Sequence, residues 1–194
     1  MSARIWLVRH GETEWSREGR HTGRTDILLT AEGESQATAA GGRLTAKPGL
    51  VLCSPLTRAR RTAELAGLQP DAYDDDLMEW DYGAWEGLTT LEIRDRTGDP
   101  TWRIWNDPIP AGATPGEQIA DVGLRTSRVI GRCMPLLRKD IDCVLVAHGH
   151  ALRVLTAMWL GLSPDAARFF ALSPASMSTL GFEHEQHVIS HWNA

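Results

Sequence analysis

The sequence predicts an α/β fold with a mostly parallel sheet that ends in an antiparallel C-terminal edge. Two runs, Ile5–Val8 and Val144–Ala147, are apolar without interruption, as expected of strands buried on both faces of a parallel sheet. Between these runs strand-like and helix-like segments alternate along the chain. The two segments nearest the C-terminus alternate apolar and polar residues, which is typical of a hairpin.

Capping residues and apolar runs define the elements of the first half. Thr30 can cap a helix that an alanine-rich run continues to about Thr45. A short apolar run at 50–53 ends at Ser54-Pro55 and predicts a strand. The next segments are an Arg- and Ala-rich helix at 57–65, an extended acidic connection at 71–76 and an irregular loop at 77–83.

Glycine and proline divide the second half. Thr89 to about Asn106 has a helical pattern with breaks at Gly98 and Pro100. The segment 111–116, rich in glycine and proline, is the expected mobile lid. The remaining expected elements are a helix at 117–138, a strand at 143–147, a helix at 150–160 that Gly161 and Pro164 end, and a hairpin at 177–183 and 187–191.

The composition of the 194 residues is that of one globular domain without a dividing linker, since 42% are hydrophobic and 23% are charged. The net charge of −5 argues against a nucleic-acid partner. The most apolar later stretch, Cys143–Leu162, contains two histidines and an arginine, so no membrane association is expected, and no signal peptide is visible. The cysteines are odd in number and are expected to be reduced thiols of a cytoplasmic protein: Cys53, Cys133 and Cys143.

Histidine and arginine side chains come after the C-terminal ends of three expected strands. Arg9 and His10 follow the first strand, Arg58 follows the second by five residues, and His148 follows the strand at 143–147. Ligands bind at this edge of an open α/β sheet, so we expect these side chains to meet there. Arginine presents the donor fork that a phosphate needs, a histidine kept neutral by nearby cations can attack phosphorus, and a second histidine can stabilise developing charge.

The sequence His148-Gly149-His150 also has the spacing of a metal-binding pair of histidines. Because Gly149 breaks the strand, we expect His150 to turn away into the following helix. No third ligand with a recognisable spacing accompanies the pair. We therefore expect no metal and no cofactor, with metal binding as the alternative that the pair leaves open.

Four motifs extend this pattern over most of the chain. They are Leu7-Val8-Arg9-His10-Gly11-Glu12-Thr13, Ser54-Pro55-Leu56-x-Arg58-Ala59, Glu79-x-x-x-Gly83-x-Trp85-Glu86-Gly87 and Ala147-His148-Gly149-His150. Together they resemble the histidine phosphatase superfamily, which includes the phosphoglycerate mutases. The resemblance implies one three-layer α/β/α domain over residues 1–194, a covalent phosphohistidine on His10 and no need for a metal. It places Arg9, Arg58 and His148 in the phosphate pocket and makes Glu79 the proton donor.

The residues alone do not single out Glu79 from Asp81 or Glu86 as the acid. Crowding by Asp81 and by the substrate phosphate would favour the protonated form of Glu79 that this role requires. Further motifs resemble the branch of sedoheptulose-bisphosphatase-like enzymes and mycobacterial-type acid phosphatases: Trp15-Ser16, His21-Thr22-Gly23-Arg24-Thr25-Asp26, Glu79-Trp80-Asp81-Tyr82-Gly83 and Ile104-Trp105. That resemblance also implies substrate contacts, which we expect at Ser16, Thr22, Gly23 and Gly149.

Three functions fit these observations. The leading one is a metal-independent phosphomonoesterase that acts on a small phosphorylated metabolite through His10. A phosphoglycerate-type mutase is the second, but mutases usually have Asn where this chain has Ser16, and they carry a longer segment between Glu79 and His148. The third is a catalytically silent phospho-ligand binding module, against which the intact acid and nucleophile argue. The sequence leaves homodimer formation open and does not identify the metabolite.

Overall fold

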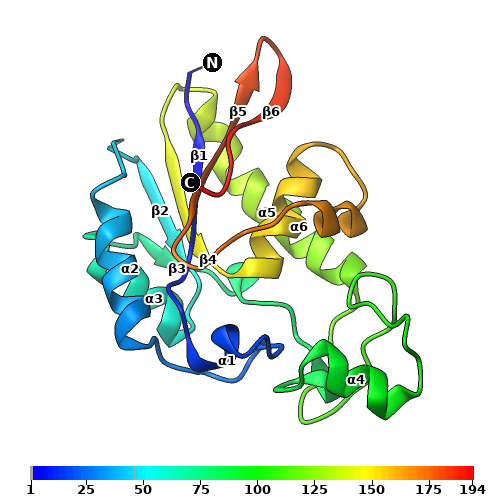
Figure 1. Ribbon diagram of the computed structural model, residues 1–194. Coiled ribbons are helices and arrows are strands. Elements are labelled where there is room, and N and C mark those ends of the chain that lie inside the picture. The colour runs from blue at the N-terminus through cyan, green and yellow to red at the C-terminus, as the bar shows by residue number, and fades with distance from the viewer. Residues whose placement is uncertain (1, 46) are drawn as a thin grey trace.

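A computed structural model describes residues 2–45 and 47–194 of the chain (Figure 1). Within these residues six strands form one sheet in the order β3-β2-β4-β1-β5-β6. The strands are β1 (Ile5–Arg9), β2 (Leu50–Cys53), β3 (Ala72–Tyr73), β4 (Cys143–Ala147), β5 (Met177–Glu183) and β6 (Gln186–His191). The first four run parallel, and β5 and β6 are antiparallel, so the predicted mixed sheet is confirmed.

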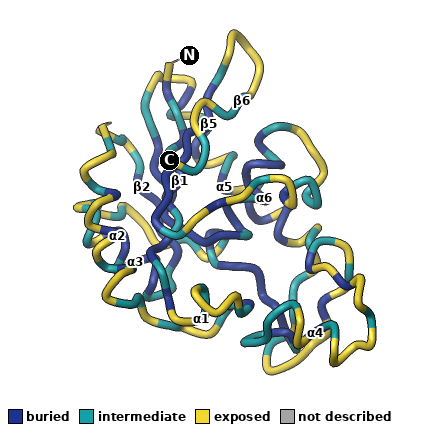
Figure 2. The backbone as a smooth tube through the Cα atoms, in the orientation of Figure 1, coloured by how far each residue is buried: buried dark blue, intermediate teal, exposed yellow. Residues whose placement is uncertain are grey.

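Helices cover both faces of the sheet, with α2 (Ala31–Gly41) and α3 (Thr57–Leu65) on one and α5 (Ile119–Leu137) and α6 (Gly149–Trp159) on the other (Figure 1). Neighbouring residues of a strand point to opposite faces. Side chains of β1 and β4 therefore contribute alternately to two separate apolar clusters, one on each face. Accordingly β4 is buried along its whole length, and β1 and β2 are buried along most of theirs (Figure 2). Three layers result.

A third apolar cluster lies between the segment that connects β3 to α5 and residues of α5, α6 and the 164–169 turn. The connecting segment contains the short helices η2 (Gly83–Trp85) and α4 (Thr90–Thr97) and forms the lobe drawn in green in Figure 1. Its largest side chains are aromatic: Trp80, Tyr82, Trp85 and Trp102. Tyr82 of this aromatic lobe lines a cleft at the strand ends.

The structure corrects several expected boundaries. The helix expected to about Thr45 ends at Gly41, and the long helix begins at Ile119. The helical pattern from Thr89 to Asn106 gives only α4, because Gly98 takes the left-handed conformation (φ 69°) that ends a helix. Five short elements were not expected as such: α1 (Glu14–Arg17), β3, η1 (Asp75–Leu77), η2 and η3 (Pro164–Phe169).

Two expectations from composition concern membranes and thiols. In the part of the chain that the structure describes, no helix combines the length and the apolar character needed to span a membrane. Cys53, Cys133 and Cys143 are all free and buried, as expected.

The register of the parallel strands brings their C-terminal ends to one edge. Arg9 pairs with Ala147, and the next residue, His10, donates its backbone N–H to the Ala147 carbonyl at 2.9 Å. The backbone N–H of Ser54 donates in the same way to Val146, also at 2.9 Å. The segments that leave β1, β2 and β4 therefore begin side by side.

Candidate active site

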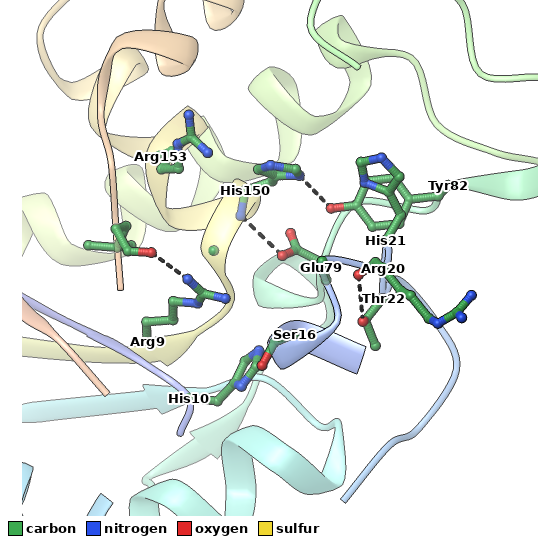
Figure 3. Close-up of a pocket in the computed structure, with 13 residues that line it drawn as sticks. Arg9, His10, Ser16, Arg20, His21, Thr22, Glu79, Tyr82, His150 and Arg153 are labelled. Atoms are coloured by element: carbon green, nitrogen blue, oxygen red, sulfur yellow. Dashed lines mark hydrogen bonds between the residues drawn. The ribbon is translucent and has the colours of Figure 1, made fainter. Parts of the chain in front are cut away.

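A cavity of about 220 Å³ lies at this edge of the sheet, between the strand ends and the aromatic lobe (Figure 3). The side chains that line it come from the N-terminal segment, from the segment around Glu79, from α6 and from the chain before β5. They are Arg9, His10, Ser16, Gly19, Arg20, His21, Thr22, Glu79, Tyr82, Gly149, His150, Arg153 and Leu172. Six of the nine residues expected to form the site are among them.

The His10 ring is held in one tautomer. Its Nδ1 lies 2.7 Å from the carbonyl oxygen of Gly11, and a carbonyl can only accept, so Nδ1 carries the proton. Burial, and next to it the charges of Arg58 and Arg9, hold the pKa of His10 well below its ordinary value. The ring is therefore neutral, and the lone pair of Nε2 is free to attack.

Gly11 serves the packing of the chain next to His10. A Cβ at this position would lie 2.2 Å from the carbonyl oxygen of Gly33 in α2. Because that oxygen belongs to the backbone of a helix, it cannot move aside to make room. Its N–H donates to Thr62 Oγ1 at 3.1 Å and not into the cavity. Glycine here permits the close approach of α2 and not the approach of a ligand to the backbone.

His148 lies against His10, with 5.1 Å between the ring centroids. Arg58 donates from Nε to His148 Nδ1 at 3.1 Å, so the proton of the neutral ring is on Nε2. That proton points to Ser54 Oγ at 2.7 Å. Burial, with the charge of Arg58 next, lowers the pKa of His148 well below its ordinary value. His148 is thus a neutral ring that donates from Nε2 to Ser54, the residue directly after β2.

Arg58 is fully buried and does not line the cavity. Besides the bond to His148, it donates to the carbonyl oxygens of Thr25 at 2.9 Å, Gly23 at 2.8 Å and Thr22 at 3.2 Å. Four of its five N–H groups are therefore engaged. In this structure Arg58 orients His148 and holds the 22–25 loop in place.

Arg9 lines the cavity and has N–H groups left to donate to a ligand. Its Nη1 donates to the Leu172 carbonyl, while its buried Nε has no partner. No carboxylate pairs with Arg9, Arg58 or Arg153 among the residues that the structure describes. A Cβ on Gly149 would lie 3.2 Å from Arg9 Nε, so this glycine leaves room for the guanidinium. These cations favour an anionic ligand.

Glu79 reaches the cavity at the N-terminus of α6. Its Oε1 accepts the N–H groups of Trp80 and Ala151, both at 2.9 Å, and its Oε2 accepts that of His150 at 3.0 Å (Figure 3). Three backbone N–H groups therefore fix the position of the Glu79 carboxyl at the start of α6.

The hydrogen bonds of the Asp81 carboxylate are made to the residues that follow it and not to Glu79, which gives no support to the crowding expected from the sequence. The Asp81 carboxylate accepts the N–H groups of Gly83 at 3.0 Å and Gly116 at 3.2 Å and the hydroxyl of Thr114. It thereby fastens the end of the 111–116 loop, the segment expected as a lid. Glu86 binds the N–H groups of Gly23 and Thr25 outside the cavity. Glu79 is the only one of the three candidate acids that lines it.

Of the four residues expected to contact the substrate, three line the cavity and one does not. Ser16 and Thr22 line the cavity, although the Ser16 hydroxyl also closes the capping box of α1 with Thr13. Gly149 lines it as well. Gly23 does not: its N–H donates to Glu86 Oε1 at 2.8 Å and its carbonyl accepts from Arg58. Gly23 therefore contacts Arg58 and not the cavity.

The two histidines of the His148-Gly149-His150 sequence face different partners. His150 lies in the first turn of α6, as expected, but it does not turn away from the site: it lines the cavity, and its Nδ1 lies 2.5 Å from Tyr82 Oη (Figure 3). His148 faces Arg58 and Ser54. Across residues 2–45 and 47–194, no group of three or more His, Cys, Asp or Glu side chains is placed to hold a metal ion.

Several cavity residues were missed in the sequence because nothing in their spacing marks them. His21, Tyr82 and His150 form an aromatic wall with centroid separations of 5.0 to 6.2 Å. Arg153 stacks on Trp105 at 4.4 Å, and burial lowers its pKa to about 10. Ser54, which contacts His148 but does not line the cavity, could have been noticed from its position directly after a strand.

Comparison with known proteins places this geometry in context. The sequence model described as the histidine phosphatase superfamily (branch 1) matches residues 5–194. An acid phosphatase of Mycobacterium tuberculosis is 40% identical over 184 residues, which cover 93% of this chain and 87% of the relative. Sedoheptulose 1,7-bisphosphatase of Saccharomyces cerevisiae is 38% identical over 192 residues, covering 84% and 69%. The solved structure of an open reading frame product of Mycobacterium tuberculosis matches with a TM-score of 0.91 at 37% identity, covering 100% and 98% of the two chains.

Proposed function

The chain belongs to branch 1 of the histidine phosphatase superfamily and is a histidine phosphatase, and on that premise we propose that it hydrolyses a small phosphorylated metabolite through a phosphohistidine on His10. The observation that carries this proposal is the bond from His10 Nδ1 to the Gly11 carbonyl, which leaves Nε2 unprotonated inside a cationic cavity. We further propose that residues 1–194 act as one domain, in the cytoplasm, without a metal or cofactor.

In the first step, Nε2 of His10 attacks phosphorus and a phosphorus–nitrogen bond forms. The bond from phosphorus to the leaving oxygen breaks, and protonated Glu79 gives its proton to that oxygen. Arg9 donates to the phosphoryl oxygens as their charge changes, and His148 joins it when its Nε2–H, which points to Ser54 Oγ in the structure, exchanges that partner for a phosphoryl oxygen. The fixed tautomers of His10 and His148 support these two roles, because one ring offers a lone pair and the other a proton.

In the second step, a water molecule attacks the phosphohistidine. Glu79, now a carboxylate, accepts a proton from the water, the phosphorus–nitrogen bond breaks, and inorganic phosphate leaves. Glu79 is then protonated again for the next turnover. A mutase would instead return the phosphoryl group to a second hydroxyl of a bound sugar acid. The altered Ser16 position and the phosphatase names of the mycobacterial and yeast relatives favour hydrolysis.

A screen for phosphate release tests this proposal. We expect one or more members of a panel of sugar phosphates, phosphorylated sugar acids and nucleotides to be hydrolysed, and the rate to be unchanged in excess EDTA. The cations of the cavity supply the charge that a metal would otherwise provide. Loss of activity on chelation that zinc restores would contradict the mechanism. Phosphoryl exchange between sugar acids without phosphate release would identify a mutase.

The acid side of the pH profile should reflect the buried His10. Because its pKa lies well below 6.5, the ring stays neutral, and competent, at pH values where an exposed imidazole would already be protonated. We therefore expect kcat with saturating p-nitrophenyl phosphate to hold as pH falls through 6.5 and to decline only below it. A half-maximal kcat at pH 6.5 would show that His10 titrates as a solvated ring.

A further inference from the structure

An ion pair of a buried arginine and a partly buried glutamate lies outside the cavity, next to the segment that carries Glu79. Arg125 of α5, only 5% exposed, donates from Nε to Glu117 Oε1 at 2.8 Å and from Nη2 to Glu117 Oε2 at 3.1 Å. Neither residue lines the cavity or contacts the phosphate-binding side chains. Glu117 directly precedes α5 and Arg125 lies within it, so both are far along the chain from β1 and β2. The two-step mechanism gives this pair no role.

On the N-terminal side of Glu79, Arg125 fixes the backbone. Its Nη1 donates to the carbonyl oxygens of Asp76 at 2.8 Å and Met78 at 2.6 Å. The carbonyl of Met78 belongs to the peptide that leads directly into Glu79. These residues have no strand partners, since η1 ends at Leu77 and the chain then runs without regular structure.

On the C-terminal side of Glu79, Glu117 does the same. Its Oε2 accepts the N–H of Asp81 at 2.9 Å, and its backbone pairs with Asp81 and with the Trp80 indole at 2.9 and 2.8 Å. Arg24 adds a longer bond of 3.3 Å to the same carboxylate oxygen. The chain is therefore held on both sides of Glu79 by the two members of one ion pair.

We propose that the Arg125–Glu117 pair is a positioning element for the acid: it sets where the Glu79 carboxyl stands relative to the leaving oxygen. The bonds of the pair converge on the backbone of residues 76, 78 and 81, with Glu79 in their centre. A pair that served stability alone could be replaced by apolar side chains at little cost, because burying two charges is itself unfavourable. The inference rests on the proposed role of Glu79 as the acid.

Arg125→Lys tests the positioning role. Lysine keeps the charge but has one nitrogen, which cannot reach Glu117 and two carbonyls as the guanidinium does. We expect kcat for an alkyl phosphate from the panel to fall about 10- to 100-fold, the effect of a displacement of about 1 Å in a reacting group. With p-nitrophenyl phosphate, whose leaving group needs no proton, kcat should fall less than about threefold.

Two further variants keep this test decisive if Arg125→Lys folds poorly. Glu117→Gln retains the size of the side chain but removes its charge, and should show the same selectivity for the alkyl ester. Arg128→Lys is the matched control, since Arg128 lies on the same helix, is 58% exposed and binds only the side chain of Asp76. It should leave the rates with both substrates unchanged. Thermal melts of all three report on folding.

A double-mutant cycle separates positioning from general damage. If Arg125 acts through Glu79, adding Arg125→Lys to Glu79→Gln should not lower the alkyl phosphate rate further. The positioning role would be overturned if Arg125→Lys and Glu117→Gln each lowered the rates with both substrates equally. In that case the rate losses of Arg125→Lys and Glu79→Gln would also multiply in the double variant. Failure of the proposed acid is read separately, because Glu79→Gln alone would then lose its selectivity between the two substrates.

Discussion

His10→Ala should abolish hydrolysis of every phosphate ester and leave the fold intact. The substitution removes the only atom that forms the bond to phosphorus, and His148, whose Nδ1 accepts from Arg58, offers no lone pair in its place. We expect kcat to fall roughly 10⁴-fold or more, as for other covalent nucleophiles. The His10 side chain has a single hydrogen bond, to Gly11, so the melting temperature should change little. Phosphate release and a thermal melt measure both effects.

A histidine of the terminal hairpin provides the control for this variant. His184 is exposed in the turn between β5 and β6, at φ 54°, a conformation that asparagine tolerates. His184→Asn should retain full activity. Turnover of p-nitrophenyl phosphate by His10→Ala at the wild-type rate would exclude His10 as the nucleophile.

Glu79→Gln should separate substrates by their leaving groups. A glutamine cannot donate a proton to an alkoxide, so the rate with an alkyl phosphate should fall on the order of 10² to 10⁴-fold. The loss with p-nitrophenyl phosphate should be much smaller. It need not be zero, because the glutamine NH₂ group replaces an oxygen that accepts the His150 N–H at 3.0 Å. Steady-state kcat values for the two substrates give the ratio.

Asp81→Asn is the matched comparison for this result. Its carboxylate lies two residues further on and binds the 114–116 segment and Gly83, not the cavity. Any loss from Asp81→Asn should therefore be equal for the two substrates. A selective loss from Asp81→Asn, together with equal losses from Glu79→Gln, would transfer the acid role to Asp81.

The parts of the site that lie at strand ends could be predicted from the sequence. Uninterrupted apolar runs identify buried parallel strands, and such strands bring the residues at their C-terminal ends to one edge of the sheet. The positions of Arg9, His10 and His148 can be inferred in this way. The roles of the cations were harder to foresee, because an arginine near a strand end can use its donors on backbone carbonyls, as Arg58 does.

The wall around Glu79 could not be predicted, because it has neither helical nor strand periodicity. Three carboxylates lie close together in this part of the sequence: Glu79, Asp81 and Glu86. Which of them faces the cavity is decided by hydrogen bonds to residues that are remote in the sequence. The partners that fix Glu79 are separated from it in sequence by much of the aromatic lobe and by α5. The same holds for Gly23, whose surroundings are set by Glu86 and Arg58.

Trapping the phosphoenzyme tests the central claim most directly. Wild-type protein is mixed with ³²P-labelled substrate, quenched rapidly without acid and separated from small molecules. The account predicts a labelled protein whose phosphate is lost in acid and retained in base, as expected of a phosphorus–nitrogen bond, with the label on the peptide that contains His10 and none on His10→Ala. A label that is stable in acid, or one that persists in His10→Ala, would contradict it.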